Sequence, residues 1–222
     1  MENIKKQMLE IGKLCFQKGY TETCGSSITV KHNEYYLQSP SGVAYQRWDI
    51  DREDILVLDH QFELKQGRGY VPADAIIHWD ILEEFNEFNA CLHVHGKNSL
   101  VFACANKSIP PITEQMFSHG EVKIIPNLPW EENPVTNKEY PSSFINRVDI
   151  IRRSENVSTA VRDIIRKHKN IKKGVGVLLP NHGIILCGNN LNSCYDLLER
   201  IEHNAYVSLL SKMANIEPKI LL

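Results

Sequence analysis

The sequence predicts a single α/β domain that spans residues 1–222. Its 222 residues lie near the upper end of the size range of one domain. Hydrophobic residues make up 42% of the chain and charged residues 23%, which is enough apolar surface for a core and excludes a disordered or fibrous protein. Short β-prone runs alternate with segments of helical period, as in α/β folds.

The first part of the chain contains two helical patterns and three β-prone runs. Apolar residues recur at three-to-four spacing over residues 2–18, and Gly19 follows as a stop signal. Residues 24–42 alternate polar and apolar side chains around a turn at 32–34, which predicts a hairpin that ends in a loop at 39–42. Residues 55–59 form a third short strand, and residues 72–88 a second helix with Pro72 in its first turn.

The second part continues this alternation without a second domain. Strands are expected over residues 90–95, 121–125, 174–180 and 184–188, and helices over 98–105, around 157–165 and over 191–214. Four prolines within residues 126–147 exclude a long regular element there and predict a loop.

Charge and cysteine usage exclude several classes of protein. The net charge is −2 and no long block of like charge occurs, so neither nucleic acid nor an anionic membrane is an expected partner. No apolar run reaches the roughly 20 residues of a membrane span, and the first residues predict an amphipathic helix without the apolar core of a signal peptide. The six cysteines contain no CxxC pair and are expected to be reduced. The expected location is therefore the cytosol.

His93 and His95 form the first candidate site. They lie two residues apart in a predicted strand, so both imidazoles leave the same face with Cα atoms about 7 Å apart, which two ligands of one metal can bridge. The simpler interpretation is a pair of partly buried, hydrogen-bonded histidines.

His182 is the third candidate ligand. A buried apolar strand ends at Pro180, and Gly183 directly after His182 lets backbone come close. Three neutral imidazoles with an open fourth position are typical of a catalytic zinc site, although cobalt, manganese or iron accept the same ligands. The other histidines lack a partner at ligand spacing and are interpreted as surface or core residues: His32, His60, His119, His168 and His203.

Asp74 is a candidate of a different kind. It lies two residues after Pro72 in the first turn of the second predicted helix, with His78 one turn later on the same face. From the local sequence alone, the favoured interpretation is a carboxylate that satisfies the NH groups at a helix start.

Four segments together resemble the class II aldolase and adducin family. They are SITVKHNEYYLQSPSGVAY at 27–45, residues 74–78, HVHGKNSLVFACA at 93–105 and LLPNHGIILCGNNLNSCYDLLERIEHNA at 178–205. The HxHG and NHG motifs are specific in combination, whereas either alone is a weak signal. The resemblance covers most of the chain and implies the family's fold, a central mixed and mostly antiparallel sheet flanked by helices.

The resemblance also implies a metal site and a catalytic residue. The family's ligands of a divalent metal, usually zinc, correspond to His93, His95 and His182. Its catalytic carboxylate, most often Glu, corresponds to Asp74. In the aldolases of the family this carboxylate moves a proton at the carbon next to the carbonyl, and the epimerase branch has Asp at the position.

The phosphate-binding residues of the family are only partly retained. Ser27 replaces the Asn of one binding turn, Ser41 and Gly42 match a second turn, and Pro72 and Ala73 replace a pair of serines. Backbone NH groups together with Ser27 and Ser41 can still hold a phosphate. The loss of two hydroxyl donors favours a differently placed phosphate or a carboxylate on the substrate.

From the resemblance we expect an enzyme of carbohydrate metabolism, a metal-dependent lyase of aldolase type that cleaves a small, phosphorylated keto sugar. A metal-stabilised enediolate serves aldol cleavage, 4-epimerisation, dehydration and decarboxylation alike, so an epimerase, a dehydratase and a decarboxylase are alternatives on the same site. A non-catalytic binding module like the adducin head is a further alternative. The family also implies a homotetramer with active sites at subunit contacts.

Overall fold

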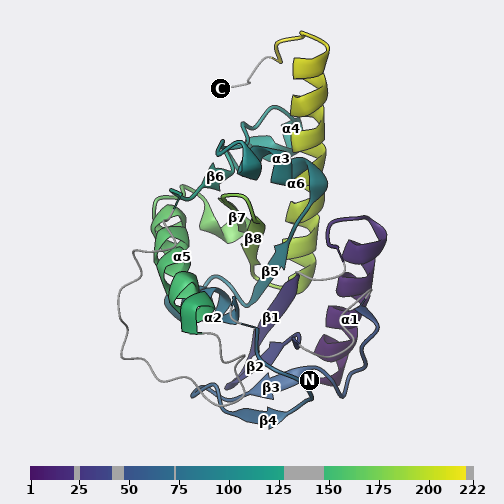
Figure 1. The fold of residues 1–222 in the computed structure, drawn as a ribbon, viewed down its shortest axis with the longest axis vertical. Helices are drawn as coiled ribbons and strands as arrows, with labels where there is room; N and C mark the ends of the chain where they lie inside the picture. Colours follow the sequence, from purple (N-terminus) through teal and green to yellow (C-terminus); the bar gives the residue numbers. More distant parts are fainter. Residues whose placement is uncertain (23–25, 42–47, 73, 128–147, 219–222) are drawn as a thin grey trace.

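The computed structural model describes residues 1–22, 26–41, 48–72, 74–127 and 148–218 (Figure 1). In this part of the chain one eight-stranded sheet has the order β4-β3-β2-β1-β5-β8-β7-β6. Its strands are β1 (Ser27–His32), β2 (Tyr35–Gln38), β3 (Leu56–Leu58), β4 (Leu64–Gln66), β5 (Ala90–Val94), β6 (Lys123–Ile124), β7 (Val175–Leu179) and β8 (Gly183–Gly188). Only β6 and β7 pair in parallel, which confirms the expected mixed, mostly antiparallel sheet.

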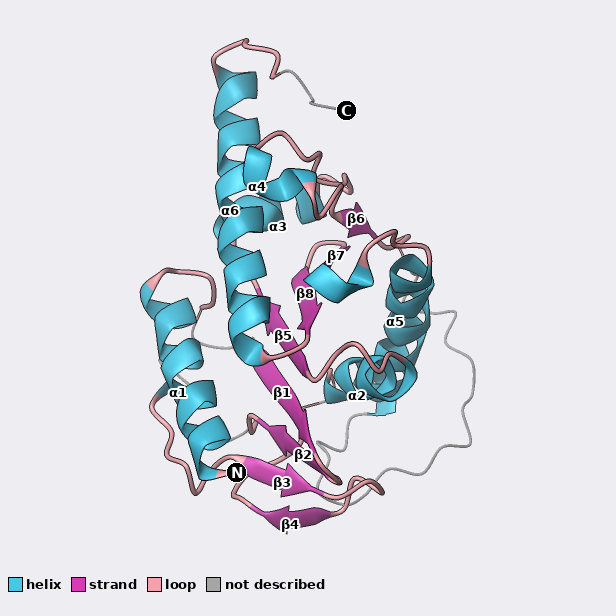
Figure 2. Cartoon of the chain, turned by 180° about the vertical axis from the view of Figure 1, so that it is seen from behind, coloured by secondary structure: helices cyan, strands magenta, loops and turns pink. Residues whose placement is uncertain are grey.

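Helices cover both faces of this sheet. They are α1 (Glu2–Gln17), α2 (Ala75–Glu84), α3 (Lys97–Cys104), α4 (Glu114–Phe117), α5 (Val148–Arg166) and α6 (Leu191–Met213), with a 3-10 turn at Ile171–Lys173. Figures 1 and 2 show α2 and α5 on one side of the sheet and α1 and α6 on the other. Each side encloses its own apolar core, so the chain forms three layers.

The expected elements are confirmed with small shifts at their ends. The hairpin of β1 and β2 turns at Asn33, whose φ of 54° is a left-handed conformation that Asn tolerates. The second helix is shorter than predicted, since it runs from Ala75 to Glu84 and the chain is already extended at Phe85. The elements β4, α4 and the 3-10 turn were not expected, because three or four residues are too short to display a period.

Two further expectations concern membranes and the proline-rich loop. Among the residues that the structure describes, no helix has the length and apolar character to cross a membrane. Most of the loop expected at 126–147 lies outside the described residues.

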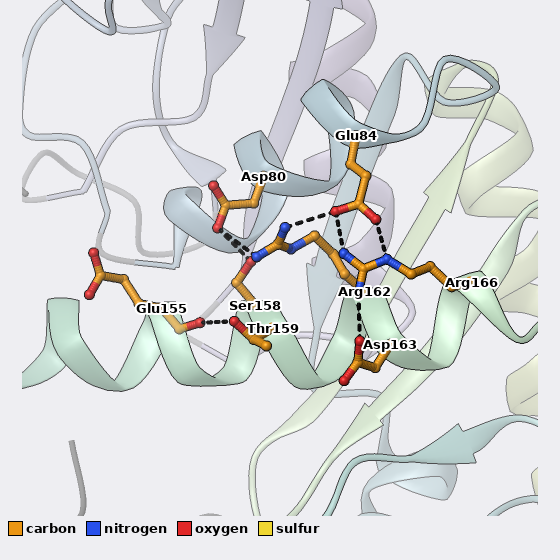
Figure 3. Close-up of polar contacts among 8 residues, drawn as sticks. All are labelled: Asp80, Glu84, Glu155, Ser158, Thr159, Arg162, Asp163 and Arg166. Atoms are coloured by element: carbon orange, nitrogen blue, oxygen red, sulfur yellow. Dashed lines mark hydrogen bonds and ion pairs between the residues drawn. The ribbon is translucent and has the colours of Figure 1, made fainter. Parts of the chain in front are cut away.

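An ionic network joins α2 to α5 (Figure 3). The guanidinium of Arg166 contacts both oxygens of Glu84, at 2.5 and 2.7 Å, and Arg162 donates to the same carboxylate at 2.8 Å. Ser158 donates to Asp80 at 2.7 Å. Because these partners lie on one flank of α2, the network fixes the rotation of the helix that begins directly after the candidate catalytic carboxylate.

Candidate metal centre

Two site histidines leave the α2 side of the central strand β5. Leu92 and Val94 are buried in the core beneath α1, α3 and α6, whereas Cys91 belongs to the core beneath α2 and α5. Since side chains alternate along a strand, His93 projects to the α2 side, and His95, directly after the strand, follows the same alternation.

The third histidine is placed by a tight turn between β7 and β8. The NH of His182 donates to the carbonyl of Leu179 at 3.1 Å, and Asn181 has a φ of 55°. Proline at the second position and a positive φ at the third are typical of a type II turn. The NH of Asn181 also donates to the carbonyl of Ala103 at 3.2 Å, which anchors the turn to α3.

The three imidazoles converge at one point. The ring centroids of His93, His95 and His182 lie 4.7–5.0 Å apart, and one nitrogen of each ring lies within 4.8 Å of the others. The Nε2 atoms of His93 and His95 are 3.1 Å apart. Two nitrogens bound tetrahedrally at 2.0–2.1 Å to one zinc ion would be about 3.3 Å apart, so the spacing fits such an ion.

The hydrogen-bond partners determine which nitrogen carries the proton. Nδ1 of His93 lies 3.0 Å from the carbonyl of Ile184, and Nδ1 of His95 lies 2.8 Å from the carboxylate of Glu22. A carbonyl and a carboxylate only accept, so both Nδ1 atoms donate. In the neutral form, in which imidazoles bind metals, both Nε2 atoms therefore present lone pairs to each other at 3.1 Å. Two such lone pairs repel each other, and a cation bound between the rings would remove the repulsion.

Burial keeps the central ligand neutral. It lowers the pKa of His93 well below its ordinary value, and the neighbouring imidazoles of His182 and His95 lower it further. A metal binds the neutral imidazole, so His93 is in the binding form at neutral pH.

Glycines allow the segments around the site histidines to approach their neighbours closely. A Cβ on Gly183 would lie 2.4 Å from the carbonyl oxygen of Val94 and 2.7 Å from the ring of His95, and a Cβ on Gly96 would lie 2.2 Å from Glu202. The buried carboxylate of Glu202 accepts from the NH groups of two residues at the start of α3, each at 3.0 Å. The glycines of the HxHG and NHG motifs are thus required by packing, and Glu202, which the sequence analysis missed, caps the helix behind the site.

Asp74 lies at the start of α2 but does not cap it. Its side chain makes no hydrogen bond to the NH groups of the helix, contrary to the interpretation favoured by the local sequence. Instead, Oδ2 accepts from the hydroxyl of Ser27 at 2.6 Å. Ser27 is paired with His93 across β1 and β5, so this carboxylate belongs to the same end of the sheet as the histidine cluster.

The other expected binding residues are only partly described. Ser41 forms an isolated backbone bridge with Tyr70, two residues before Pro72. Gly42 and Ala73 lie outside the described residues.

A family model for the class II aldolase and adducin N-terminal domain matches residues 6–209. The chain belongs to this family. The match includes all three site histidines and Asp74, and it agrees with the resemblance that the sequence motifs indicated.

Individual relatives are distant but cover nearly the whole chain. A 5-deoxy-D-ribulose 1-phosphate aldolase of Bacillus thuringiensis serovar kurstaki is 23% identical over 100% of this chain and 91% of its own length. A 3-oxo-tetronate 4-phosphate decarboxylase of Haemophilus influenzae is 22% identical over 90% of this chain and 84% of its own. A solved L-fuculose 1-phosphate aldolase superposes with a TM-score of 0.77 at 19% identity, covering 100% of this chain and 92% of that one. This last likeness establishes the fold.

Proposed function

We propose that this class II aldolase family member is a metal-dependent lyase that cleaves a small phosphorylated keto sugar in an aldol-type reaction. The observation that carries the proposal is the cluster of His93, His95 and His182, with the Nε2 atoms of His93 and His95 3.1 Å apart. Such a donor set fits a divalent cation, and zinc is our first choice.

The reaction breaks the C–C bond between the α and β carbons of the ketose, counted from the carbonyl. In a ketose 1-phosphate, the C3–C4 bond breaks, its electron pair stays on C3, and the C4 hydroxyl loses its proton to give an aldehyde. C3 then takes up a proton to give dihydroxyacetone phosphate. A divalent cation in the histidine cluster would supply Lewis-acid stabilisation of the negative charge that develops on the substrate oxygen.

The residues of the chain supply the remaining steps. In this proposal the carboxylate of Asp74 moves the proton at C3. The turn with Ser41 and Gly42 binds the phosphate through hydroxyl and backbone NH groups. The sequence also suggests Ser27 as a phosphate ligand, but its hydroxyl donates to Asp74.

Metal analysis tests the site. The purified protein is expected to contain about one divalent ion per chain, and a His93→Ala, His95→Ala double variant almost none, because two of three ligands are lost. The exposed His60 provides a matched control, His60→Ala, which should retain the ion. Equal metal content in the wild type and the double variant would remove the metal assignment.

Product analysis tests the reaction. 5-Deoxyribulose 1-phosphate and fuculose 1-phosphate are the first substrates to try, since relatives or structural neighbours carry those names. Release of dihydroxyacetone phosphate with acetaldehyde or lactaldehyde, abolished by a chelator, supports a lyase.

A decarboxylase is the second candidate, favoured by the relative from Haemophilus influenzae and by the loss of the serine pair before Asp74. Release of CO₂ from a β-keto acid phosphate without an aldehyde would select it. An epimerised sugar with no released fragment would select an epimerase, to which the Asp at position 74 is also suited. Metal binding without turnover of any of these would favour a binding module.

The proposal includes a homotetramer. Tyr206, Leu210 and Met213 recur at helical spacing on α6 and expose 43–79% of their surface. An apolar stripe of this kind suits contact between subunits.

A further inference from the structure

Two polar contacts connect β1 with α2 beside the candidate metal centre. Ser27 and Thr29 lie two residues apart on β1 and share a face, and Asp74 and His78 lie four residues apart and share a face of α2. The hydroxyl of Ser27 contacts Asp74 Oδ2 at 2.6 Å, and the hydroxyl of Thr29 contacts His78 Nδ1 at 2.7 Å. The two hydrogen bonds therefore lie next to each other between the same strand and the same helix.

The hydrogen bond between Thr29 and His78 has a defined direction. The amide nitrogen of Gln38 donates to the carbonyl of Ser39 at 3.0 Å, so the amide oxygen faces the hydroxyl of Thr29 at 2.5 Å. The hydroxyl gives its single proton to this oxygen and therefore accepts from Nδ1 of His78. The side chains of Thr29, Gln38 and His78 are fully buried, so this hydrogen bond holds the helix against the strand.

The hydrogen bond between Ser27 and Asp74 has a single possible direction. A carboxylate only accepts, so Ser27 donates its hydroxyl proton to Asp74. Ser27 is 2% exposed and is paired directly with His93 on β5, which brings the contact to the metal side of the sheet. One carboxylate oxygen is held by this bond, and Oδ1 makes no hydrogen bond to any residue that the structure describes, so it can exchange a proton.

We propose that Ser27 is a positioning residue that aims the Asp74 carboxylate at the substrate, with Thr29 and His78 fixing the helix behind it. This inference rests on the proposed lyase function and differs from the role expected from the sequence. While Ser27 donates its proton to Asp74, that proton is not available to a phosphate, so phosphate recognition depends on other groups.

Steady-state kinetics of Ser27→Ala distinguish the two roles. If Ser27 orients Asp74, kcat falls about 10- to 100-fold, while KM, inhibition by inorganic phosphate and metal content stay at wild-type values. Ser27→Thr restores the hydroxyl and should recover most of kcat. Ser208→Ala removes another buried serine hydroxyl, on α6, and serves as the matched control with unchanged kinetics.

A double-mutant cycle provides the second readout. In an Asp74→Asn background, Ser27→Ala should cause little further loss of kcat, because the residue that it orients is already inactivated. Independent, multiplicative losses would overturn the proposal. A raised KM with weaker phosphate inhibition and an unchanged kcat would overturn it too, and would establish Ser27 as a phosphate ligand while the lyase function stands. A wild type that cleaves none of the substrates would refute the proposed function first, and the positioning role with it.

Discussion

Glu22 and Ile184 determine how the site imidazoles face their common centre. Each accepts a hydrogen bond from a different Nδ1, so in the neutral rings the Nε2 atoms of His93 and His95 carry the lone pairs. The two acceptors differ in strength, since a carboxylate holds the imidazole proton more strongly than a carbonyl and makes the opposite nitrogen a better ligand. The affinity of the proposed site for a metal would therefore depend on groups that do not touch the ion.

Replacing the charged acceptor should weaken the site. Glu22→Gln keeps the size of the side chain but removes the charge, so the affinity for zinc is expected to fall about 10- to 100-fold. Competition with a chromogenic chelator measures this. Glu34→Gln, at an exposed position in the hairpin turn, should leave the affinity unchanged. Equal affinities of wild type and Glu22→Gln would exclude the role of Glu22.

The helix α2 is held by different forces on its two flanks. On one side, buried hydroxyl contacts join its first turns to β1, and on the other, Arg162 and Arg166 of α5 bind Glu84 near its last turn (Figure 3). Hydrogen bonds to Arg166 lower the pKa of Glu84; burial opposes this shift, and the hydrogen bond to Arg162 adds a lowering effect that is smaller than that of burial. At the scale of elements, the position of Asp74 is thus coupled to α5.

This coupling predicts a pH-dependent contribution to stability. Because the pKa of Glu84 in the folded protein is lower than its ordinary 4.5, the contribution is present above pH 4.5 and is lost as the pH falls through the folded pKa. Glu84→Gln should lower Tm at pH 7 by about 1–3 °C, a modest effect because the pair is partly screened by solvent. Calorimetry should show that the difference in Tm between wild type and variant disappears as the pH is lowered. Glu87→Gln, just after α2 and outside this network, is the control, and a difference that persists below the folded pKa would contradict the assignment.

The long helix α6 connects the site to the outer surface of the molecule. Glu202, in its middle, caps α3 behind the HxHG turn, whereas its far end extends beyond the sheet (Figure 1) and exposes Tyr206, Leu210 and Met213. The same helix therefore supports the candidate metal centre from within and exposes an apolar stripe of the kind that suits a subunit contact.

A charge in this stripe should disrupt the proposed homotetramer. Leu210→Glu is expected to shift the protein from about four chains per particle to dimers or monomers, because the carboxylate would have to be desolvated at the contact. Light scattering after size-exclusion chromatography measures the mass. Gln17→Glu adds the same charge at an exposed position of α1 and should leave the mass unchanged. A wild-type monomer would contradict the homotetramer.

Local patterns in the sequence were sufficient to predict most elements and the histidines that converge. Three-to-four spacing located the long helices, alternation located β5 and the direction of His93, and the HxHG and NHG motifs indicated the family. These features are encoded in neighbouring residues, whose spacing along the chain dictates which face they share.

Which groups these faces contact depends on how distant segments pack together. Sheet register brought His182, some ninety residues away from His93, beside it. It also paired Ser27 with His93, and the docking of α2 gave Asp74 a hydroxyl partner instead of the helix NH groups that the local sequence favoured. Glu22 and Glu202 carry no local signal, because an acidic residue becomes the partner of a histidine or a helix cap only through the distant group that folding brings to it.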